Sequence, residues 1–478
     1  MGGGTLQLTK PPRSKPSGAA SGGFCKNLLY IRIIKTQTFE FLVDKLADRC
    51  HSVLSNQHKD DVMAYYSRIA DAVLVRGLTS SGAVLIEGAK GCGKTETAAR
   101  VANSLVRFDT DLDVAIKMDI DPKLVLTGDT PRLLDEWQLF PRIWDYTRRE
   151  VDARKGKGQF ILTGSATPDE QARKHSGAGR FSVMKMRPMS WFERGWSSGE
   201  VSLESIFNGN ALHSADVDFS IKDLCDKVAL GGWPGLIGER TNAAYDFTRN
   251  YVALIAEVDI DRVSERRRNA PKVLRFIRSL ARNISTEASI RSIASDAGGS
   301  DDTLDDETAS AYLQALERLM VTENLPAWNP HIRSSAALRK SPKRHFCDAS
   351  LALGALGMTA QKLSSDLNFL GMLFESVVIR DLRVYAWATE GTVSHYRDAS
   401  GHEVDAIVEY PDGKWGAFEV KMGMGAVDEA AANLLAFAEK IDTSKTPAAS
   451  ILCVITGNGF AHRRSDGVCV IPLATLRN

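Results

Sequence analysis

The sequence lacks any apolar run that is long enough to cross a membrane, which takes about 18 residues. The nearest stretch, Leu28 to Ile34, is short and contains Arg32. An excess of either charge is also missing, because 60 Lys and Arg residues face 59 Asp and Glu residues and the formal net charge is +1. General attraction to nucleic acid or to acidic membranes is therefore excluded, and any such binding needs a local basic patch.

Cysteine is sparse and dispersed. The 478 residues include 7 cysteines, none of them in a CxxC pair or at the spacing of a zinc site. This usage argues against a disulfide framework and suits the reducing cytosol. We therefore expect a cytoplasmic protein.

The length of the chain points to about three domains. They are preceded by an N-terminal stretch whose positions 1–24 are rich in Gly, Ser, Pro, Lys and Arg, as in disordered segments. We interpret residues 1–60 as a disordered extension, or as one that is not native, in which case the natural start would be Met63.

Hydrophobic patterning divides the remainder into three regions. Residues 61–210 alternate short apolar runs with helical patterns, which is typical of the parallel sheet of an α/β domain. Residues 211–340 are mostly helical, and residues 341–478 mix helices with strands. In the first and last regions we expect a helix at 96–106 and strands at 83–86, 160–162, 404–409, 416–421 and 451–456.

The helical region has the order of a winged helix-turn-helix unit. Helices are expected at 271–284 and 286–297, a third from 307 to 319, and then a strand or wing at 321–328. The helix at 271–284 places four basic residues on one face, namely Lys272, Arg275, Arg278 and Arg282. Such a face suits a phosphate backbone. A solvated amphipathic helix explains the same spacing equally well.

A phosphate-binding motif stands between the first expected strand and the first expected helix. The run Gly88-Ala-Lys-Gly-Cys-Gly-Lys-Thr95 matches the pattern G-x-x-x-x-G-K-[ST] in full. Its glycines, Gly88, Gly91 and Gly93, let the backbone turn so that N–H groups face phosphate oxygens. Lys94 would reach the β- and γ-phosphates, and the Thr95 hydroxyl would bind Mg²⁺. The sequence thus predicts an ATP and Mg²⁺ site; the alternative is a chance glycine turn.

Hydrolysis needs carboxylates at the end of a second strand, and Asp135 and Glu136 supply them. Asp135 would hold Mg²⁺, and Glu136 would polarise the attacking water. Thr163 and Ser165 end the next apolar run, a place that resembles one in the ring-forming ATPases, and this resemblance implies that a polar side chain there contacts the γ-phosphate or the water. A solvated turn is the alternative for the carboxylate pair.

Three stretches together resemble a known family. They are Pro131-Arg-Leu-Leu-Asp-Glu-Trp-Gln138, Ile161-Leu-Thr-Gly-Ser-Ala-Thr-Pro168 and Gly179-Arg180. This set is similar to a large prokaryotic family of AAA-type ATPases that carry a C-terminal endonuclease-like domain of unknown function. The similarity runs from about Tyr66 to the C-terminus. The resemblance implies that Arg180 senses the γ-phosphate in cis or across subunits, the alternative being a surface arginine, and it allows homo-oligomers.

A second constellation lies near the C-terminus. Asp405 belongs to one expected strand, and Glu419 and Lys421 end the next, where alternation points both to one side. The two carboxylates would hold a divalent metal ion, and Lys421 would stabilise developing negative charge. The pattern resembles the PD-(D/E)xK nucleases, a likeness that adds Glu375 from an upstream helix as a further metal ligand. The alternative is a solvated sheet edge.

Three functions therefore compete. The first is an ATPase coupled to a nucleic-acid-acting, endonuclease-like module. The second is a nucleotide-dependent switch that binds a protein partner and has a non-catalytic C-terminal domain. The third is a nucleotide-binding housekeeping protein whose C-terminal carboxylates are structural. The intact C-terminal set favours the first function, whereas the lack of a strong basic region favours the second.

Overall fold

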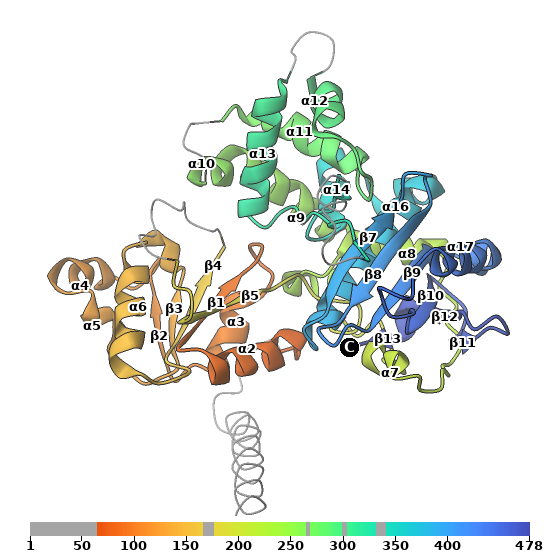
Figure 1. The fold of residues 1–478 in the computed structure, drawn as a ribbon. Coiled ribbons are helices and arrows are strands. Elements are labelled where there is room, and N and C mark those ends of the chain that lie inside the picture. The colour runs from red at the N-terminus through yellow and green to blue at the C-terminus, as the bar shows by residue number, and fades with distance from the viewer. Residues whose placement is uncertain (1–64, 166–175, 264–267, 299–303, 331–340) are drawn as a thin grey trace, which may run out of the picture. The chain divides into compact units, whose positions relative to one another are not determined.

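The computed structural model describes residues 65–165, 176–263, 268–298, 304–330 and 341–478 (Figure 1). The extension expected at residues 1–60 lies outside the described residues. None of the described helices combines the length and the apolar character that crossing a membrane requires.

The first part of the chain forms a five-stranded parallel sheet, coloured orange to yellow in Figure 1. Its strands run in the order β2-β3-β4-β1-β5. Their bounds are β1 Ala83–Glu87, β2 Ser104–Arg107, β3 Arg132–Asp135, β4 Phe160–Gly164 and β5 Phe181–Lys185. The expected parallel sheet is confirmed. Because the strands are parallel, their carboxyl ends meet at one edge, and ligands of such sheets bind there.

Helices cover both faces of this sheet. On one face, α2 (Ile69–Ser80) and α3 (Lys94–Ala99) pack around Val84 and Ile86. On the other face, Leu85 meets the helices α4 Val114–Ile120, α5 Lys123–Leu126 and α6 Ile143–Arg154. Alternate residues of β1 thus enter two separate cores, which is why the strand reads as a continuous apolar run.

The helix expected at 96–106 was predicted too long. α3 ends at Ala99, and the residues after it turn into β2, the edge strand of the sheet. β2 pairs with β3 in parallel register, with Leu105 beside Leu133. A short apolar run fits either period, and pairing with a strand distant in sequence selected the extended form.

The middle of the chain is helical, as expected. α9 (Thr241–Leu254) continues through a π-helical turn (Ile255–Asp259) into α10 (Ile260–Arg262). The other helices of this part are α8 Ile221–Leu230, α11 Ala270–Arg282, α12 Ile290–Gly298, α13 Asp306–Arg318, α14 Ser350–Leu356 and α15 Ala360–Leu363. Helices α11 to α13 lie close to the ranges expected for the winged unit.

The strand expected at 321–328 is reduced to isolated bridges. Thr322 pairs with Phe346 and Leu325 pairs with Lys343, both in antiparallel orientation. We call residues 321–328 and 343–346 the paired arms. They follow three helices as a wing would, although a winged-helix fold stays a prediction.

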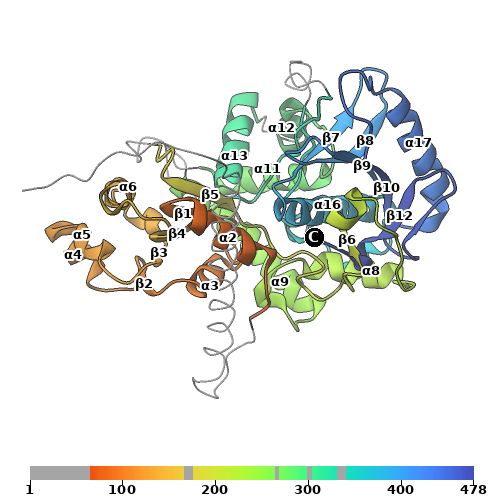
Figure 2. The same ribbon diagram turned by 60° about the horizontal axis from the view of Figure 1, so that its bottom comes forward.

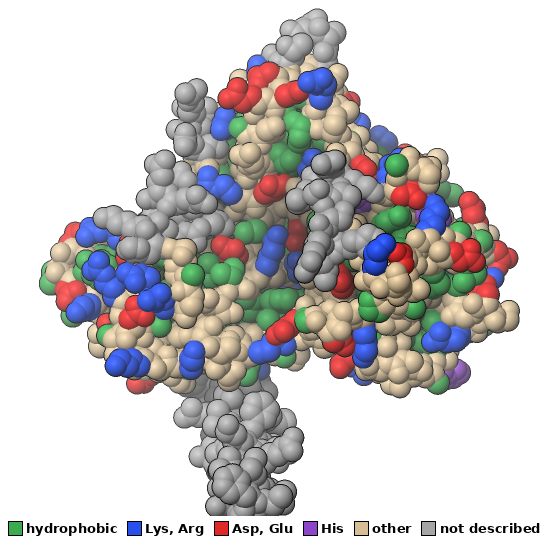
Figure 3. All heavy atoms as spheres, viewed as in Figure 1, with side chains coloured by type: hydrophobic (Ala, Val, Ile, Leu, Met, Phe, Trp, Pro, Cys, Tyr) green, Lys and Arg blue, Asp and Glu red, His purple; other side chains and the backbone are tan. Residues whose placement is uncertain are grey.

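The basic side chains expected to face solvent on α11 are engaged within the protein. Arg275 and Arg278 each donate to a backbone carbonyl of a neighbouring helix at 3.2 Å. Arg282 forms an ion pair with Asp296 at 2.5 Å. On the face seen in Figure 3, basic side chains of the described residues are interspersed with acidic ones, apart from a basic group over α6. Binding of nucleic acid by α11 stays a prediction.

The last part of the chain forms a six-stranded mixed sheet in the order β11-β12-β10-β9-β8-β7. Its strands are β7 Thr392–Arg397, β8 Glu403–Glu409, β9 Trp415–Lys421, β10 Ile451–Thr456, β11 His462–Arg463 and β12 Cys469–Pro472. α16 (Leu367–Trp387) packs on one face and α17 (Val427–Glu439) on the other (Figure 2). The three strands expected here are confirmed.

A segment within the range 61–210 packs with this last sheet. β6 (Val201–Ser202) pairs with β13 (Leu476–Arg477) at the C-terminus. In α7 (Leu203–Phe207), the ring of Phe207 lies against that of Tyr410, with centroids 4.8 Å apart. The domain boundaries themselves stay predictions.

Candidate functional site

The phosphate-binding loop joins β1 to α3 at the carboxyl edge of the parallel sheet. Gly91 and Gly93 have φ angles of +73° and +101°, in a region that glycine enters without strain. A Cβ at Gly88 would lie 2.3 Å from the carbonyl oxygen of Met186. Lys94 is buried, and its Nζ donates to two loop carbonyls at 2.9 Å each. Both glycines that the motif requires, Gly88 and Gly93, are therefore needed by the backbone, Gly88 for space and Gly93 for its φ angle.

Asp135 connects this loop to the neighbouring strands. It ends β3 and is buried. Its Oδ1 accepts hydrogen bonds from Thr95 Oγ1 at 2.8 Å and from Thr163 Oγ1 at 2.5 Å. Side chains from three separate motifs thus meet at one oxygen atom. Hydroxyl and carboxylate oxygens are the ligands that Mg²⁺ prefers, so Thr95 and Asp135 fit a Mg²⁺ ion.

Glu136 and Ser165 line a cavity of about 1190 Å³ beside the loop. The cavity is also lined by Gly91, Gly93, Lys94 and Thr95. Glu136 has a φ of +55°, so the backbone turns sharply directly after Asp135. Its carboxylate accepts a hydrogen bond from the Gln138 amide. The volume is ample for a ligand the size of a nucleotide.

A second wall of the cavity comes from the helical region and includes Pro234, Gly235 and Arg262. Lys90 of the loop forms an ion pair with Asp259 at 2.5 Å, at the end of the π-helical turn. Arg262 lies 3.5 Å from the same carboxylate, and its side chain is 65% exposed. The helical region therefore adds a cation to the lining of the cavity.

Arg68 supports the loop from behind. Its Nη1 donates to the carbonyl of Cys92 in the loop at 2.8 Å, and its Nη2 donates to the carbonyl of Arg187 at 2.8 Å. The guanidinium also forms a buried ion pair with Glu193 at 3.1 Å. One side chain thus holds the loop against the chain that leaves β5.

Arg180 lies at the opposite end of the sheet from the loop. Its carbonyl accepts a hydrogen bond from the N–H of Ala83, where β1 begins, whereas the loop follows the end of β1. The strand between them rises about 3.3 Å per residue. Arg180 pairs with Asp152 at 2.9 Å and is well exposed. Within one chain this is the position of a surface arginine, and a role across subunits stays a prediction.

The predicted C-terminal residues converge where β8 begins beside the end of β9. Glu419 forms an ion pair with Lys421 at 3.1 Å and accepts a hydrogen bond from Asn433 of α17 at 2.8 Å. Burial, together with the nearby Asp405, raises the pKa of Glu419 to about 8. Asp405 accepts a hydrogen bond from the N–H of Val420 at 2.9 Å. The register of β7 on β8 shifts beside Asp405, a bulge of the kind that redirects a side chain.

Lys343 fills the centre of this cluster. Its Nζ lies 2.6 Å from Glu403, 2.9 Å from Glu375 and 3.2 Å from Asp405, and its side chain is 2% exposed. Burial by itself would lower the pKa of Lys343, but the three carboxylates outweigh burial and raise this pKa above its ordinary value. Burial and the nearby Asp405 raise the pKa of Glu375 to about 8. The lysine is therefore charged, and the carboxyl groups of Glu403 and Asp405 lie within ion-pair distance of its ammonium.

The predicted metal set of Glu375, Asp405 and Glu419 does not fit a metal ion in this arrangement. Among the described residues, no group of three or more His, Cys, Asp and Glu side chains is placed to hold one. The ammonium of Lys343 stands between Glu375 and Asp405, where a cation would bind. The predicted carboxylates do come together, but a lysine supplies the positive charge.

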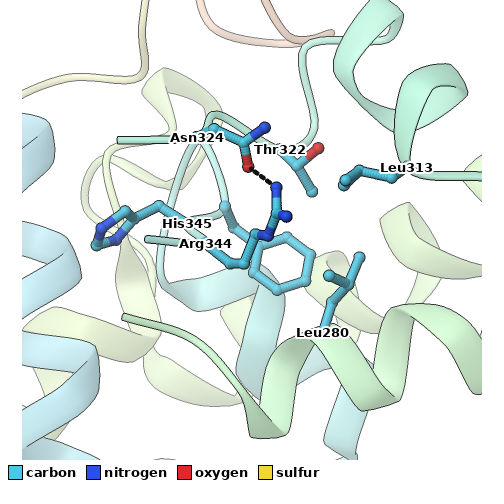
Figure 4. Close-up of a pocket in the computed structure, with 7 residues that line it drawn as sticks. Leu280, Leu313, Thr322, Asn324, Arg344 and His345 are labelled. Carbon is cyan, nitrogen blue, oxygen red and sulfur yellow. Dashed lines mark hydrogen bonds between the residues drawn. The ribbon is translucent and has the colours of Figure 1, made fainter. Parts of the chain in front are cut away.

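A small cavity of about 10 Å³ lies between helices α11 and α13 and the paired arms (Figure 4). In it, Arg344 donates a hydrogen bond to Asn324 Oδ1 at 2.8 Å. It is lined by Leu280, Leu313, Thr322, Asn324, Arg344, His345 and Phe346. A space of this size admits at most one water molecule, so it is not a substrate site.

Comparison with known families agrees with the phosphate site. Residues 80–194 match the AAA domain family. The chain contains an AAA-type P-loop ATPase domain. This ATPase domain includes the phosphate-binding loop, Asp135, Glu136 and Thr163. Residues 221–362 match a domain of unknown function, DUF8612, and residues 370–476 match another, DUF4143. The endonuclease-like character of the C-terminal part stays a prediction.

Two relatives that match most of the chain come from mycobacteria. The uncharacterized proteins Mb2031c of Mycobacterium bovis and Rv2008c of Mycobacterium tuberculosis are each 26% identical over 380 residues, or 78% of this chain and 77% of theirs. Among solved structures, the Walker-type ATPase PABY2304 of Pyrococcus abyssi is similar at 11% identity with a TM-score of 0.39. The match covers 61% of this chain and 96% of that one.

Sequence reasoning missed the residues that reach a site from another part of the chain. Lys343 stands 32 positions before Glu375 and 62 before Asp405. Asp259 and Arg262 reach the ATPase cavity from the helical region. Only one local pattern hinted at the position of Lys343. If residues 343–345 are extended, Lys343 and His345 face the same side of the strand and Arg344 faces the other.

Proposed function

We propose that the chain is a Mg²⁺-dependent ATP hydrolase. The observation that carries this proposal is the meeting of Thr95 and Thr163 at one oxygen of Asp135. Thr95 and Asp135 would hold Mg²⁺, which when bound offsets phosphate charge, and Lys94 would contact the β- and γ-phosphates. The cavity beside these residues has room for the nucleotide.

Glu136 is the general base in this proposal. It lines the cavity directly after Asp135, and the Gln138 amide holds its carboxylate. From there Glu136 would orient the attacking water and accept its proton. Arg262 would contact the phosphates from the second wall of the cavity, since a guanidinium binds phosphate oxygens well.

ATP binding and phosphate release by the full chain test this proposal. Lys94→Ala is expected to lose ATP binding. Glu136→Gln is expected to retain binding while turnover falls by about 10²- to 10⁴-fold. Lys117→Ala and Glu150→Gln, which alter surface ion pairs of α4 and α6, serve as matched controls. Turnover that persists in Lys94→Ala, or that is unchanged when EDTA removes Mg²⁺, would contradict the proposal.

Nucleotide-dependent switching is the second part of the proposal. Glu323 of the paired arms lies 3.1 Å from Lys185 and 2.7 Å from Arg187, at and just beyond the end of β5. Arg383 of α16 lies 3.5 Å from the same carboxylate. One largely buried anion thus ties the ATPase domain to the arms and to the C-terminal part, which supports coupling between these parts; binding of a partner would be the output of such a switch.

A nuclease coupled to the ATPase has less support, because Lys343 stands among the carboxylates that would hold its metal ion. Turnover and plasmid integrity, measured in the same samples with and without DNA or RNA, separate the two functions. The switch predicts turnover that is indifferent to nucleic acid and a plasmid that stays intact. Turnover stimulated by nucleic acid, with nicking that is lost in Asp405→Ala, would establish the nuclease instead.

A further inference from the structure

The cation at the centre of the C-terminal cluster reaches it from outside the C-terminal sheet. Lys343 belongs to the paired arms, whereas Glu375 lies on α16 and Asp405 on β8. The arms hold Lys343 through its backbone, which exchanges hydrogen bonds with Leu325 at 3.1 Å and 2.9 Å. The position of the ammonium is therefore set by the arms as well as by the carboxylates.

The oxygens around this ammonium are those that a divalent metal ion uses. Three carboxylates, from Glu375, Glu403 and Asp405, lie at 2.6–3.2 Å from Lys343 Nζ. Carboxylate oxygens coordinate Mg²⁺, Ca²⁺ and similar hard cations at about 2.0–2.6 Å, so a small inward movement would suffice. An ammonium and a metal ion cannot occupy that point together.

We propose that Lys343 is an internal cation that occupies a latent divalent-metal site in the C-terminal domain. While the ammonium is in place, the cluster binds no metal ion. Removal of the ammonium opens the site to a divalent metal ion. The proposal goes beyond the proposed ATPase function and does not rest on it, because Lys343 and its partners do not line the nucleotide cavity.

Charge balance supports this exchange. Without Lys343, the partly buried Glu375 and Asp405 and the more exposed Glu403 would lie together without this cation between them, and like charges at such a site repel. A divalent ion relieves this repulsion and is often the largest local charge of such a site. Lys421 would remain beside Glu419 at the edge of the cluster.

Binding of Mn²⁺ to the nucleotide-free full chain, measured by calorimetry and by thermal unfolding, tests the proposal. We compare the wild type, Lys343→Ala, and Lys343→Ala combined with Asp405→Asn. Lys414→Ala is the matched control, because Lys414 pairs with Asp412 at 3.5 Å on the nearby turn and is 47% exposed. Any weak binding at the phosphate loop is common to all four proteins and cancels in the comparison.

Lys343→Ala is expected to bind one more Mn²⁺ per chain than the wild type and to unfold at a higher temperature with Mn²⁺ than without. Adding Asp405→Asn should abolish both effects, and Lys414→Ala should behave as the wild type does. A folded Lys343→Ala protein that binds no additional Mn²⁺ would overturn the proposal. If the alanine variant does not fold, Lys343→Met is used instead, because the methionine side chain keeps the apolar packing of the lysine stem and lacks the ammonium.

The wild type supplies an independent test that needs no folded Lys343 variant. Mn²⁺ binding by the wild type that is lost in Asp405→Asn alone would show that the cluster is open with the lysine present, and would also overturn the proposal. ATP turnover is measured separately on the same proteins. Failure of the metal-site proposal is therefore distinguishable from failure of the ATPase proposal.

Discussion

Replacing Glu323 with glutamine is expected to destabilise the protein strongly at neutral pH. This carboxylate has 12% of its side chain exposed and lies among Lys185, Arg187 and Arg383 at 3.1, 2.7 and 3.5 Å. Glutamine keeps the shape but removes the charge, which leaves three cations without their shared counter-ion. Breaking a buried ion pair in this way costs about 3–5 kcal/mol.

The pH dependence of this effect follows from the pKa of Glu323. Burial would raise that pKa, but Arg187, Arg383 and Lys185 outweigh burial and hold it well below the usual 4.5. A carboxyl group whose pKa is depressed by folding stabilises the folded state above its unfolded pKa. The difference between wild type and Glu323→Gln should therefore be full above pH 4.5 and shrink as the pH falls below it.

Urea denaturation followed by tryptophan fluorescence, from pH 8 down to the lowest pH at which the wild type stays folded, measures this difference. Glu390→Gln is the matched control, because Glu390 pairs with Arg76 at 3.5 Å while its side chain is 64% exposed. An exposed pair of this kind contributes at most about 1 kcal/mol. A Glu323→Gln effect no larger than that of the control, or one that is independent of pH, would refute the reasoning.

Two further predictions concern the ATPase domain. Gly93→Ala should weaken ATP binding, because φ at this position is +101° and the new Cβ would lie 3.2 Å from Arg68 Nη1; equilibrium binding of a fluorescent nucleotide measures the loss, and unchanged affinity would contradict it. Arg180→Ala should leave the turnover of isolated chains unchanged, since Arg180 lies beside the start of β1. Turnover that falls only at concentrations where chains associate would instead reveal a role across subunits.

Much of the phosphate site could be predicted from the sequence, because its parts are local. The loop motif needs glycine at positions such as Gly93, where the backbone angle forbids most other residues. Asp135 and Thr163 each follow a short apolar run, and in a parallel sheet the ends of such runs meet at one edge. Their meeting at one oxygen depends on the strand order, in which β4 lies between β1 and β3.

The β2 strand shows where local patterning fails. Its residues Ser104–Arg107 carry a short apolar run that fits helix or strand, and the helical interpretation was wrong. The position of Arg180 within one chain was also not predictable from local patterning. Arg180 is close in sequence to Thr163, but it directly precedes β5, whose first residue pairs with Ala83 at the start of β1.

By itself, the sequence determined that this chain carries a P-loop, the carboxylates of Asp135 and Glu136 at the end of β3, and a carboxylate and lysine pattern on β8 and β9. Only the tertiary structure decided which charge stands among those C-terminal carboxylates. Lys343 reaches them from the paired arms, and no pattern of neighbouring residues records such a contact. The physical reason is that periodicity reports which face a side chain takes, whereas a buried ion pair depends on where distant backbones meet.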